Sequence, residues 1–152
     1  MVNEFWHTLL MAMMPVVELR GAIPYGLAQG LDPAATFAAA VIGNLIPAPF
    51  ILLFVRKVFL WMRTTSKWLG ETVDKLEQRA AAKADVVQKY AFWGLVVLVA
   101  IPLPGTGAWT GALVAALMNV RMTRAIPAIV LGVLLAGIVV MVISTGVLAI
   151  IA

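Results

Sequence analysis

The sequence has no cysteine and a single histidine, His7, and only 12% of its 152 residues are charged. Without cysteine the chain forms no disulfide bond, thiolate metal site or covalent haem attachment. One histidine cannot build a histidine metal cluster or a Ser-His-Asp triad within one chain. A glycine-rich loop that ends in Gly-Lys-Ser or Gly-Lys-Thr is also missing, which argues against ATP as an energy source. We therefore expect no enzyme, no cofactor and no metal site.

Apolar residues, by contrast, are abundant, since 63% of the chain is hydrophobic. A water-soluble domain of this size and composition would expose large apolar patches. The composition therefore predicts an integral membrane protein, with residues 1–152 as a single membrane domain. The net charge of +4 fits a basic face on anionic lipid, so we expect membrane lipids and no nucleic acid as partners.

Two uncharged stretches are long enough to cross a bilayer. They cover residues 33–55 and 125–152, which are 23 and 28 residues, against about 20 for a spanning helix. Asn44 lies three positions before Pro47 in the first stretch, so we expect a kink there with Asn44 facing the interior. Asp32 directly precedes the same stretch and is expected to cap its helix.

Residues 5–31 hold two shorter uncharged runs of 13 and 11 residues, separated by Glu18 and Arg20. Neither run is long enough to span a bilayer, so the segment predicts a re-entrant hairpin. The tip of this hairpin places an acid and a base at membrane depth. Ionisable side chains are costly there and usually belong to a ligand or ion pathway.

Residues 90–120 are uncharged but broken at their centre by two prolines and two glycines, namely Pro102, Pro104, Gly105 and Gly107. Proline and glycine interrupt helices, which leaves two runs of little more than half the bilayer thickness. The segment is therefore either a third span or a second hairpin.

The distribution of basic residues favours the second hairpin. Eight of the 11 Lys and Arg lie in residues 56–89, so this loop is expected on the cytoplasmic side. Arg121 and Arg124 would lie outside if 90–120 crossed the membrane, and inside with the other bases if it re-enters. Re-entry satisfies the positive-inside rule.

The predicted fold is an all-α integral membrane protein with two inverted-topology repeats, each a re-entrant hairpin followed by a transmembrane helix. Repeat 1 covers residues 5–62 and repeat 2 covers residues 90–152. Residues 63–89 are expected to form a cytoplasmic amphipathic helix that joins them, because apolar residues recur there at helical spacing. This linker is either a solvated connector on the headgroups or a regulatory site. In transporters with such repeats, broken segments meet near the midplane at the substrate site.

Small residues follow both tips with a spacing of four. Gly26 and Gly30 follow the first tip, and Gly107 and Gly111 follow the second. This small-xxx-small pattern is typical of closely packed helices in membranes. We therefore expect these glycines to serve helix packing.

The meeting point of the two tips is the predicted substrate and ion site. Its candidate residues are Glu18, Arg20, Gly21, Pro24, Asn44, Pro104, Gly105, Thr106, Gly107, Trp109 and Thr110. In the functional interpretation, Arg20 binds an anionic headgroup with its guanidinium, and Glu18 loads and releases a proton. Helix N-termini that begin after Pro24 and after Gly105 to Gly107 are expected to add backbone N–H donors for the same anion.

A structural interpretation of the charged pair stays open. Glu18 and Arg20 either form a mutual ion pair, or Arg20 binds loose backbone carbonyls at the tip. In that case the two side chains only hold the hairpin in shape.

Residues 18–24 (ELRGAIP) and 102–111 (PLPGTGAWTG) carry a resemblance to the small multidrug export protein family, a compact relative of the DedA membrane proteins. The resemblance covers nearly the whole chain, and Glu18 and Arg20 match the acid and base of the first motif. It implies a pair of re-entrant hairpins and a requirement for membrane acids and arginines. It also implies roles in proton-dependent drug tolerance and in recycling of polyprenyl phosphate carrier lipid.

We accordingly expect a small secondary transporter of the inner membrane, proton-coupled, that moves an amphipathic anion such as a polyprenyl phosphate lipid (undecaprenyl phosphate, for example). One alternative is an exporter of lipophilic cations in exchange for protons. A second alternative is a non-transporting membrane assembly protein. Two spans and two hairpins enclose little space, and broken backbone must be kept away from lipid, so a homodimer or larger homo-oligomer is expected.

Overall fold

The computed structural model describes residues 2–81, 84–103 and 106–151. Within these ranges the chain is helical and contains no strand, which confirms the predicted all-α class. The helices are α1 (Val2–Met13), α2 (Glu18–Ala28), α3 (Pro33–Leu45), α4 (Pro47–Thr65), α5 (Lys67–Ala81), α6 (Ala84–Ala100), α7 (Ala108–Leu117) and α8 (Met122–Ile151).

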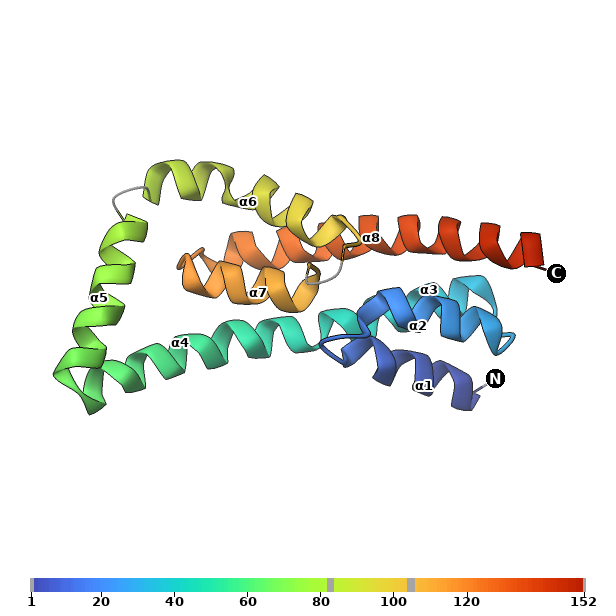
Figure 1. Cartoon of the computed structure of the whole chain (residues 1–152), viewed down its shortest axis with the longest axis horizontal. Helices are drawn as coiled ribbons and strands as arrows, with labels where there is room; N and C mark the ends of the chain where they lie inside the picture. Colours follow the sequence, from blue (N-terminus) through green and yellow to red (C-terminus); the bar gives the residue numbers. More distant parts are fainter. Residues whose placement is uncertain (1, 82–83, 104–105, 152) are drawn as a thin grey trace.

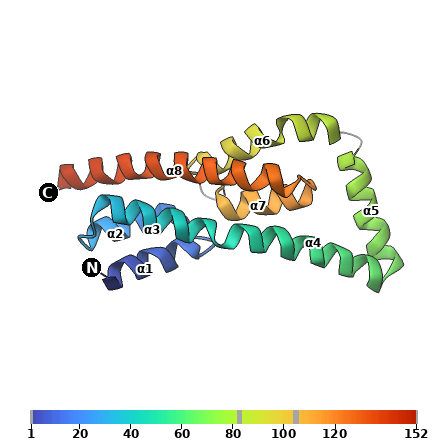
Figure 2. The same ribbon diagram turned by 180° about the vertical axis from the view of Figure 1, so that it is seen from behind.

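The helices form an elongated bundle (Figure 1). Helices α1 and α2 run antiparallel as a hairpin, and α6 and α7 do the same from the opposite end of the molecule. The end of α6 and the start of α7 lie near the turn between α1 and α2, about midway along the long axis. Helix α5 closes one end of the bundle, and both termini lie at the other end, as the view from behind also shows (Figure 2).

Two helical stretches are long and apolar enough to cross a membrane, Pro33–Thr65 with 33 residues and Met122–Ile150 with 29 residues. The first contains α3 and α4, which are separated at Ile46. Pro47 lacks a backbone N–H and interrupts the helical hydrogen bonds at this point. The helix is thus interrupted at the position where the kink was predicted, and Asn44 is buried beside it with 1% of its surface exposed.

The start of α3 is capped as expected. The Oδ2 atom of Asp32 accepts hydrogen bonds from the backbone N–H of Ala34 at 3.0 Å and of Ala35 at 3.1 Å. Pro33 occupies the first helical position, where its missing N–H costs nothing. These contacts satisfy two of the N–H groups that a helix start leaves unpaired.

Glycines allow the hairpin helices to pack closely on the long helices. A Cβ at Gly43 of α3 would collide with the backbone carbonyl of Leu9 in α1, and a Cβ at Gly132 of α8 would meet the Cβ of Val99 in α6 at 2.6 Å. Such close approach favours association of membrane helices through backbone contact. Gly43 and Gly132 thus place α1 on α3 and α6 on α8.

The glycines that follow the two tips do not all serve helix packing. A Cβ at Gly26 would meet Thr36 at 2.7 Å, and one at Gly111 would meet Val99 at 2.5 Å, so close packing is confirmed at both positions. Gly30 has open space around it and a positive φ of 75°. Its role is therefore conformational, because it sits in the turn between α2 and α3.

The α2–α3 turn and the α7–α8 turn share one hydrogen-bond pattern. In the first, Leu31 N–H donates to Gly26 O at 3.0 Å, and in the second, Val120 N–H donates to Ala115 O at 2.9 Å. Both turns use a residue with positive φ, Gly30 in the first and Asn119, with a φ of 51°, in the second. Matched residues are 89 positions apart. The same spacing separates Gly43 from Gly132 and Glu18 from Gly107.

The predicted single linker helix over 63–89 is wrong. Helix α4 continues to Thr65, α5 covers Lys67–Ala81, and α6 starts at Ala84. The break before α5 occurs at Ser66, whose backbone is extended with φ −153° and ψ 135°, so that α5 turns across the end of the bundle (Figure 1). An ion pair of 3.1 Å between Arg63 Nη2 and Asp74 Oδ1 holds α4 and α5 together.

Candidate functional site

A cavity of about 380 Å³ lies where the two hairpins meet. Its wall is built from both hairpin tips and includes one acid and one base. The lining residues are Pro15, Val16, Glu18, Arg20, Pro102, Thr106 and Thr110. The two motifs that were singled out in the sequence are therefore brought to one place by the fold.

Glu18 is the first residue of α2 and is almost completely buried, with 3% of its surface exposed. Its Oε1 atom accepts a hydrogen bond of 3.3 Å from the backbone N–H of Trp109, in the first turn of α7. The N-cap residue of α7 is Gly107, which has no side chain to cap the helix. The carboxylate of the first hairpin thus serves the N-terminus of a helix in the second hairpin, where a negative charge is favourable.

Arg20 binds the other side of the same break. Its Nη2 atom donates to Ile101 O at 3.1 Å and to Thr106 Oγ1 at 2.8 Å, and its Nη1 atom donates to Leu103 O. Helix α6 ends at Ala100, so these acceptors lie directly beyond a helix C-terminus. A positive charge is favourable there, because it offsets the negative end of the helix dipole. The same carbonyls also accept hydrogen bonds from the backbone N–H groups of Leu103, at 2.9 Å, and Thr106, at 3.2 Å.

Together the two side chains form what we call the cross-hairpin lock, defined as Glu18 on the α7 N-terminus and Arg20 on the α6 C-terminal end. Glu18 and Arg20 bind these backbone groups instead of forming an ion pair with each other. The sequence left open a mutual ion pair or bonds from Arg20 to carbonyls at its own tip, whereas the structure places the partners of both side chains in the second hairpin. One donor of the lock, Arg20 Nε, is buried without a hydrogen-bond partner.

Gly107 is the residue that lets Glu18 approach α7. Its φ is 131°, a conformation that L side chains rarely adopt, and a Cβ at this position would overlap the Glu18 carboxylate. Trp109 adds a contact in the reverse direction, because its indole Nε1 donates to Met13 O at 3.1 Å at the end of α1. Each hairpin tip therefore binds backbone groups of the other.

One expectation about the first tip is wrong. Helix α2 does not begin after Pro24; it begins at Glu18, and Pro24 lies inside it. The chain turns at residues 14–17 instead, and Glu18 N–H donates to Met14 O at 2.9 Å. Glu18 and Arg20 therefore lie in the first turn of α2, and Glu18 has a positive φ of 47° where the chain enters this helix. Helix α7 does begin directly after Gly107, as expected.

Only some of the predicted site residues lie at the cavity or at the cross-hairpin lock. Glu18, Arg20, Thr106, Gly107, Trp109 and Thr110 come together at the cavity or the lock. Gly21 and Pro24 lie further along α2 and do not line this cavity, and Asn44 is buried in α3 with its Oδ1 unpartnered. Pro104 and Gly105 lie outside the described residues.

Several contributors were missed by sequence reasoning. Met13, Ile101 and Leu103 act through backbone carbonyls, and Pro15 and Val16 through apolar surface. A backbone acceptor leaves no side-chain signal in the sequence, so only the fold identifies it. Among the described residues, no group of three or more His, Cys, Asp or Glu is placed to hold a metal ion.

The long apolar helices and the charged pair held between two helical hairpins define an all-helical membrane protein. A family model with the description "Putative small multi-drug export protein" matches residues 18–139, which include both lock residues and α7. The chain belongs to this family, which is a family of transporters by that description. No curated protein and no solved structure matches the chain.

Proposed function

We propose that the protein is a proton-coupled secondary transporter of the inner membrane whose substrate passes through the cavity between the hairpin tips. The observation that carries this proposal is the cross-hairpin lock. It places a titratable carboxylate, a guanidinium and a helix N-terminus around one cavity. The first candidate substrate is an amphipathic anion, in its most specific form a polyprenyl phosphate carrier lipid, as the DedA resemblance suggests.

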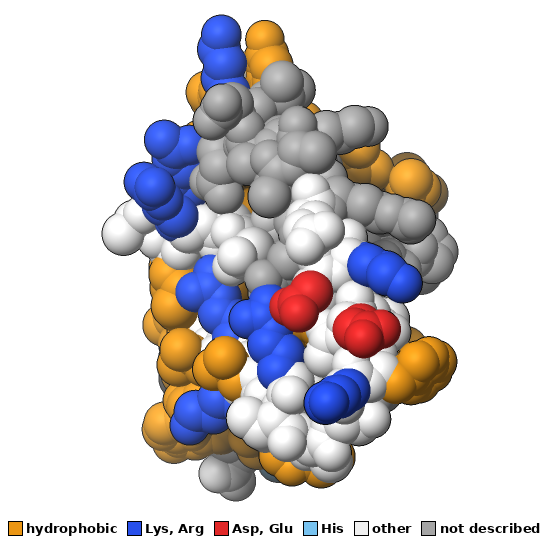
Figure 3. All heavy atoms as spheres, turned by 90° about the vertical axis from the view of Figure 1, so that its left-hand side faces the viewer, with side chains coloured by type: hydrophobic (Ala, Val, Ile, Leu, Met, Phe, Trp, Pro, Cys, Tyr) orange, Lys and Arg blue, Asp and Glu red, His pale blue; other side chains and the backbone are white. Residues whose placement is uncertain are grey.

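The proposed membrane arrangement is a pair of inverted repeats, each a re-entrant hairpin followed by a span. The matched turns, glycines and tip residues 89 positions apart support it. Glu18 and Gly107 are matched positions and lie against each other, which supports the proposal of two halves related by a pseudo-two-fold axis, as in transporters with inverted repeats. Lys and Arg side chains gather over the α5 end of the bundle (Figure 3), so this end is proposed to face the cytoplasm.

Cysteine labelling tests this arrangement, since the chain has no native cysteine. Single-cysteine variants at the exposed positions Asp32, Lys75 and Arg121 are treated with a membrane-impermeant thiol reagent in spheroplasts and in inverted vesicles. Lys75→Cys and Arg121→Cys should react from the cytoplasmic side, and Asp32→Cys from the opposite side. Reaction of Arg121→Cys from the same side as Asp32→Cys would rule out the second re-entrant hairpin.

In the proposed mechanism, protonation of Glu18 opens the lock. The ionised carboxylate accepts the Trp109 N–H and occupies the positive end of α7. A proton on Glu18 removes the charge and weakens this contact, so the α7 N-terminus becomes available to an anionic substrate group. Arg20 holds the neighbouring helix end in place and presents its guanidinium to the same cavity. Proton uptake and anion binding are thereby coupled at one position.

The second candidate function is export of lipophilic cations in exchange for protons. The family description favours it, and Glu18 is the acid among the residues that line the cavity. In this case the ionised carboxylate binds the cation directly, and protonation releases it. The two candidates therefore require opposite protonation states of Glu18 for substrate binding.

Glu18→Gln separates these candidates. For an anionic substrate, the neutral amide should strengthen binding of a short-chain polyprenyl phosphate at neutral pH by about tenfold and abolish its pH dependence, because it removes one repulsive charge. For a cationic substrate such as tetraphenylphosphonium, the same change should abolish binding. Both are measured by calorimetry on the purified protein, with Glu71→Gln on exposed α5 as the control.

Flux in proteoliposomes decides between either transporter and a non-transporting assembly protein. If the wild type transports neither probe when a proton gradient is imposed across the membrane, transport of these substrates is excluded.

We further propose a homodimer, because the turns and helix ends of the hairpins must be shielded from lipid. Native mass spectrometry of the purified protein reports that state directly.

A further inference from the structure

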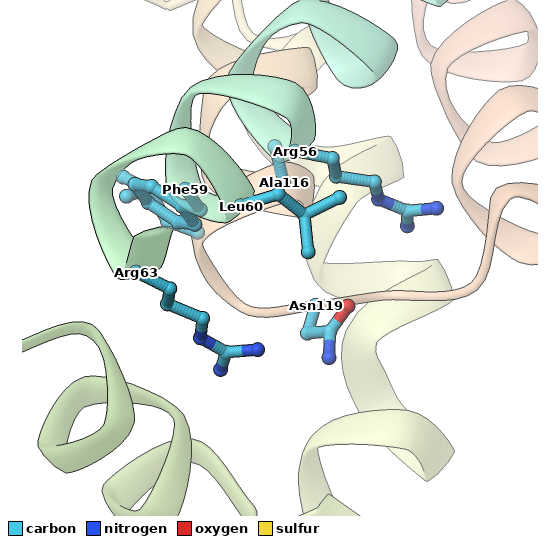
Figure 4. Close-up of a pocket in the computed structure, with 7 residues that line it drawn as sticks. Arg56, Phe59, Leu60, Arg63, Ala116 and Asn119 are labelled. Atoms are coloured by element: carbon cyan, nitrogen blue, oxygen red, sulfur yellow. The ribbon is translucent and has the colours of Figure 1, made fainter. Parts of the chain in front are cut away.

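A second cavity, of about 200 Å³, lies away from the hairpin tips, between α4 and the end of α7 (Figure 4). We call it the arginine pocket. Its lining residues are Arg56, Phe59, Leu60, Arg63, Ala116, Leu117 and Asn119. None of them belongs to the cross-hairpin lock or to the cavity proposed for transport.

The two arginines come from one face of α4, because residues seven positions apart lie two helical turns from each other on the same side. Arg56 Nη2 donates to Val120 O at 2.6 Å, just beyond α7. Its Nε is buried and has no hydrogen-bond partner. Arg63 Nη2 lies 3.1 Å from Asp74 Oδ1. The pocket therefore holds two guanidinium groups and one buried donor whose hydrogen-bonding capacity is unused.

The pocket is lined by both basic and apolar side chains. Lys57 and Arg121 flank it in the sequence, and the same end of the bundle carries a cluster of Lys and Arg side chains (Figure 3). Leu60 and Leu117 line it but remain 59% and 51% exposed. A ligand that fits must offer a negative group to the arginines and apolar surface to the two leucines.

We infer that the arginine pocket binds the phosphate group of an anionic phospholipid, with the acyl chains along Leu60 and Leu117. Arginine binds phosphate oxygens through charge-assisted, fork-shaped hydrogen bonds, and Arg56 Nε is the donor still to be satisfied. Basic clusters at the membrane surface attract anionic lipid. The lipid would bridge α4 and α7, and thus hold the second hairpin against the first long helix from the α5 end.

The test measures lipid binding to the full chain in detergent by native mass spectrometry. The probe is dioctanoyl phosphatidylglycerol, with dioctanoyl phosphatidylcholine as the zwitterionic comparison and inorganic phosphate as the competitor. The double variant Arg56→Gln/Arg63→Gln should bind phosphatidylglycerol about tenfold more weakly than the wild type. The control pair Lys57→Gln/Lys67→Gln removes the same charge from exposed positions outside the pocket and should bind nearly as well as the wild type.

A second variant covers the case in which loss of Arg56 prevents folding. Leu117→Glu keeps both arginines and places a carboxylate at the rim of the pocket, so it should also weaken phosphatidylglycerol binding. Leu113→Glu, on the exposed surface of α7 outside the pocket, is its control.

Three results would overturn the inference. Equal losses in the pocket pair and the lysine pair would indicate general surface attraction. Full displacement of the lipid by millimolar inorganic phosphate would indicate a site for a free anion. A loss of phosphatidylglycerol binding in Glu18→Gln would place the lipid at the hairpin tips. Unchanged binding in Glu18→Gln keeps this inference separate from the proposed transport function.

Discussion

Gly107→Ala should abolish transport and lower the stability of the protein. The added methyl group would overlap the Glu18 carboxylate, and alanine is disfavoured at a φ of 131°. Overpacking and backbone strain together are expected to cost about 2–4 kcal/mol of unfolding free energy. In detergent this should lower the melting temperature by roughly 5–10 °C. Proteoliposome flux should fall to the level of empty vesicles, because the carboxylate can no longer reach α7.

The control for this prediction is Gly94→Ala in α6 of the same hairpin. A Cβ at Gly94 meets no atom within 4 Å, and alanine is the better helix former by about 1 kcal/mol. This variant should therefore keep or raise the melting temperature. Wild-type flux in Gly107→Ala would show that the contact between Glu18 and α7 is dispensable for transport.

Arg20→Gln should produce the second large effect. It removes the charged donor to Ile101 O, Leu103 O and Thr106 Oγ1. The two carbonyls keep only their bonds from the backbone N–H groups of Leu103 and Thr106 and from the Thr106 hydroxyl. Hydrogen bonds from a charged donor contribute about 1.5–3 kcal/mol each, and neighbouring bonds do not add fully. We expect a loss of about 3 kcal/mol in unfolding free energy and no transport, measured by thermal unfolding and by flux.

Arg20→Lys distinguishes charge from shape at this position. Lysine keeps the favourable positive charge at the helix end but lacks the planar fork that reaches three acceptors. It should recover about half of the lost stability. If Arg20→Gln is as stable as the wild type, the lock does not hold the second hairpin, whatever its effect on flux.

Sequence patterns predicted those features that depend on neighbouring residues. The Asp32 cap, the break before Pro47 and the start of α7 after Gly107 all follow from local backbone chemistry. The prediction of a single linker helix was wrong for a related reason. One residue with extended backbone, Ser66, separates α4 from α5, and a serine in a polar stretch carries no distinctive signal.

The partners of the charged pair could not be predicted in the same way. Glu18 and Arg20 were recognised as unusual because ionisable residues are rare in apolar segments. Apart from the Thr106 hydroxyl, their acceptors and donors are backbone groups more than 80 positions away, and nearly every residue carries such groups. Whether the two charges pair with each other or with helix ends is therefore decided by how the hairpins pack. The arginine pocket escaped notice for the same reason, since it forms only when α4 and α7 pack together.

The contact between Glu18 and Gly107 limits how alike the two halves of the chain can become. The Glu18 carboxylate occupies the space that a side chain at position 107 would need, so a carboxylate in one half requires glycine at the matched position of the other half. A protein made of two copies of the first half would bring two glutamates into collision at this point, and one made of two copies of the second half would have no acid there. In the proposed inverted repeat, the two halves must therefore differ at this contact.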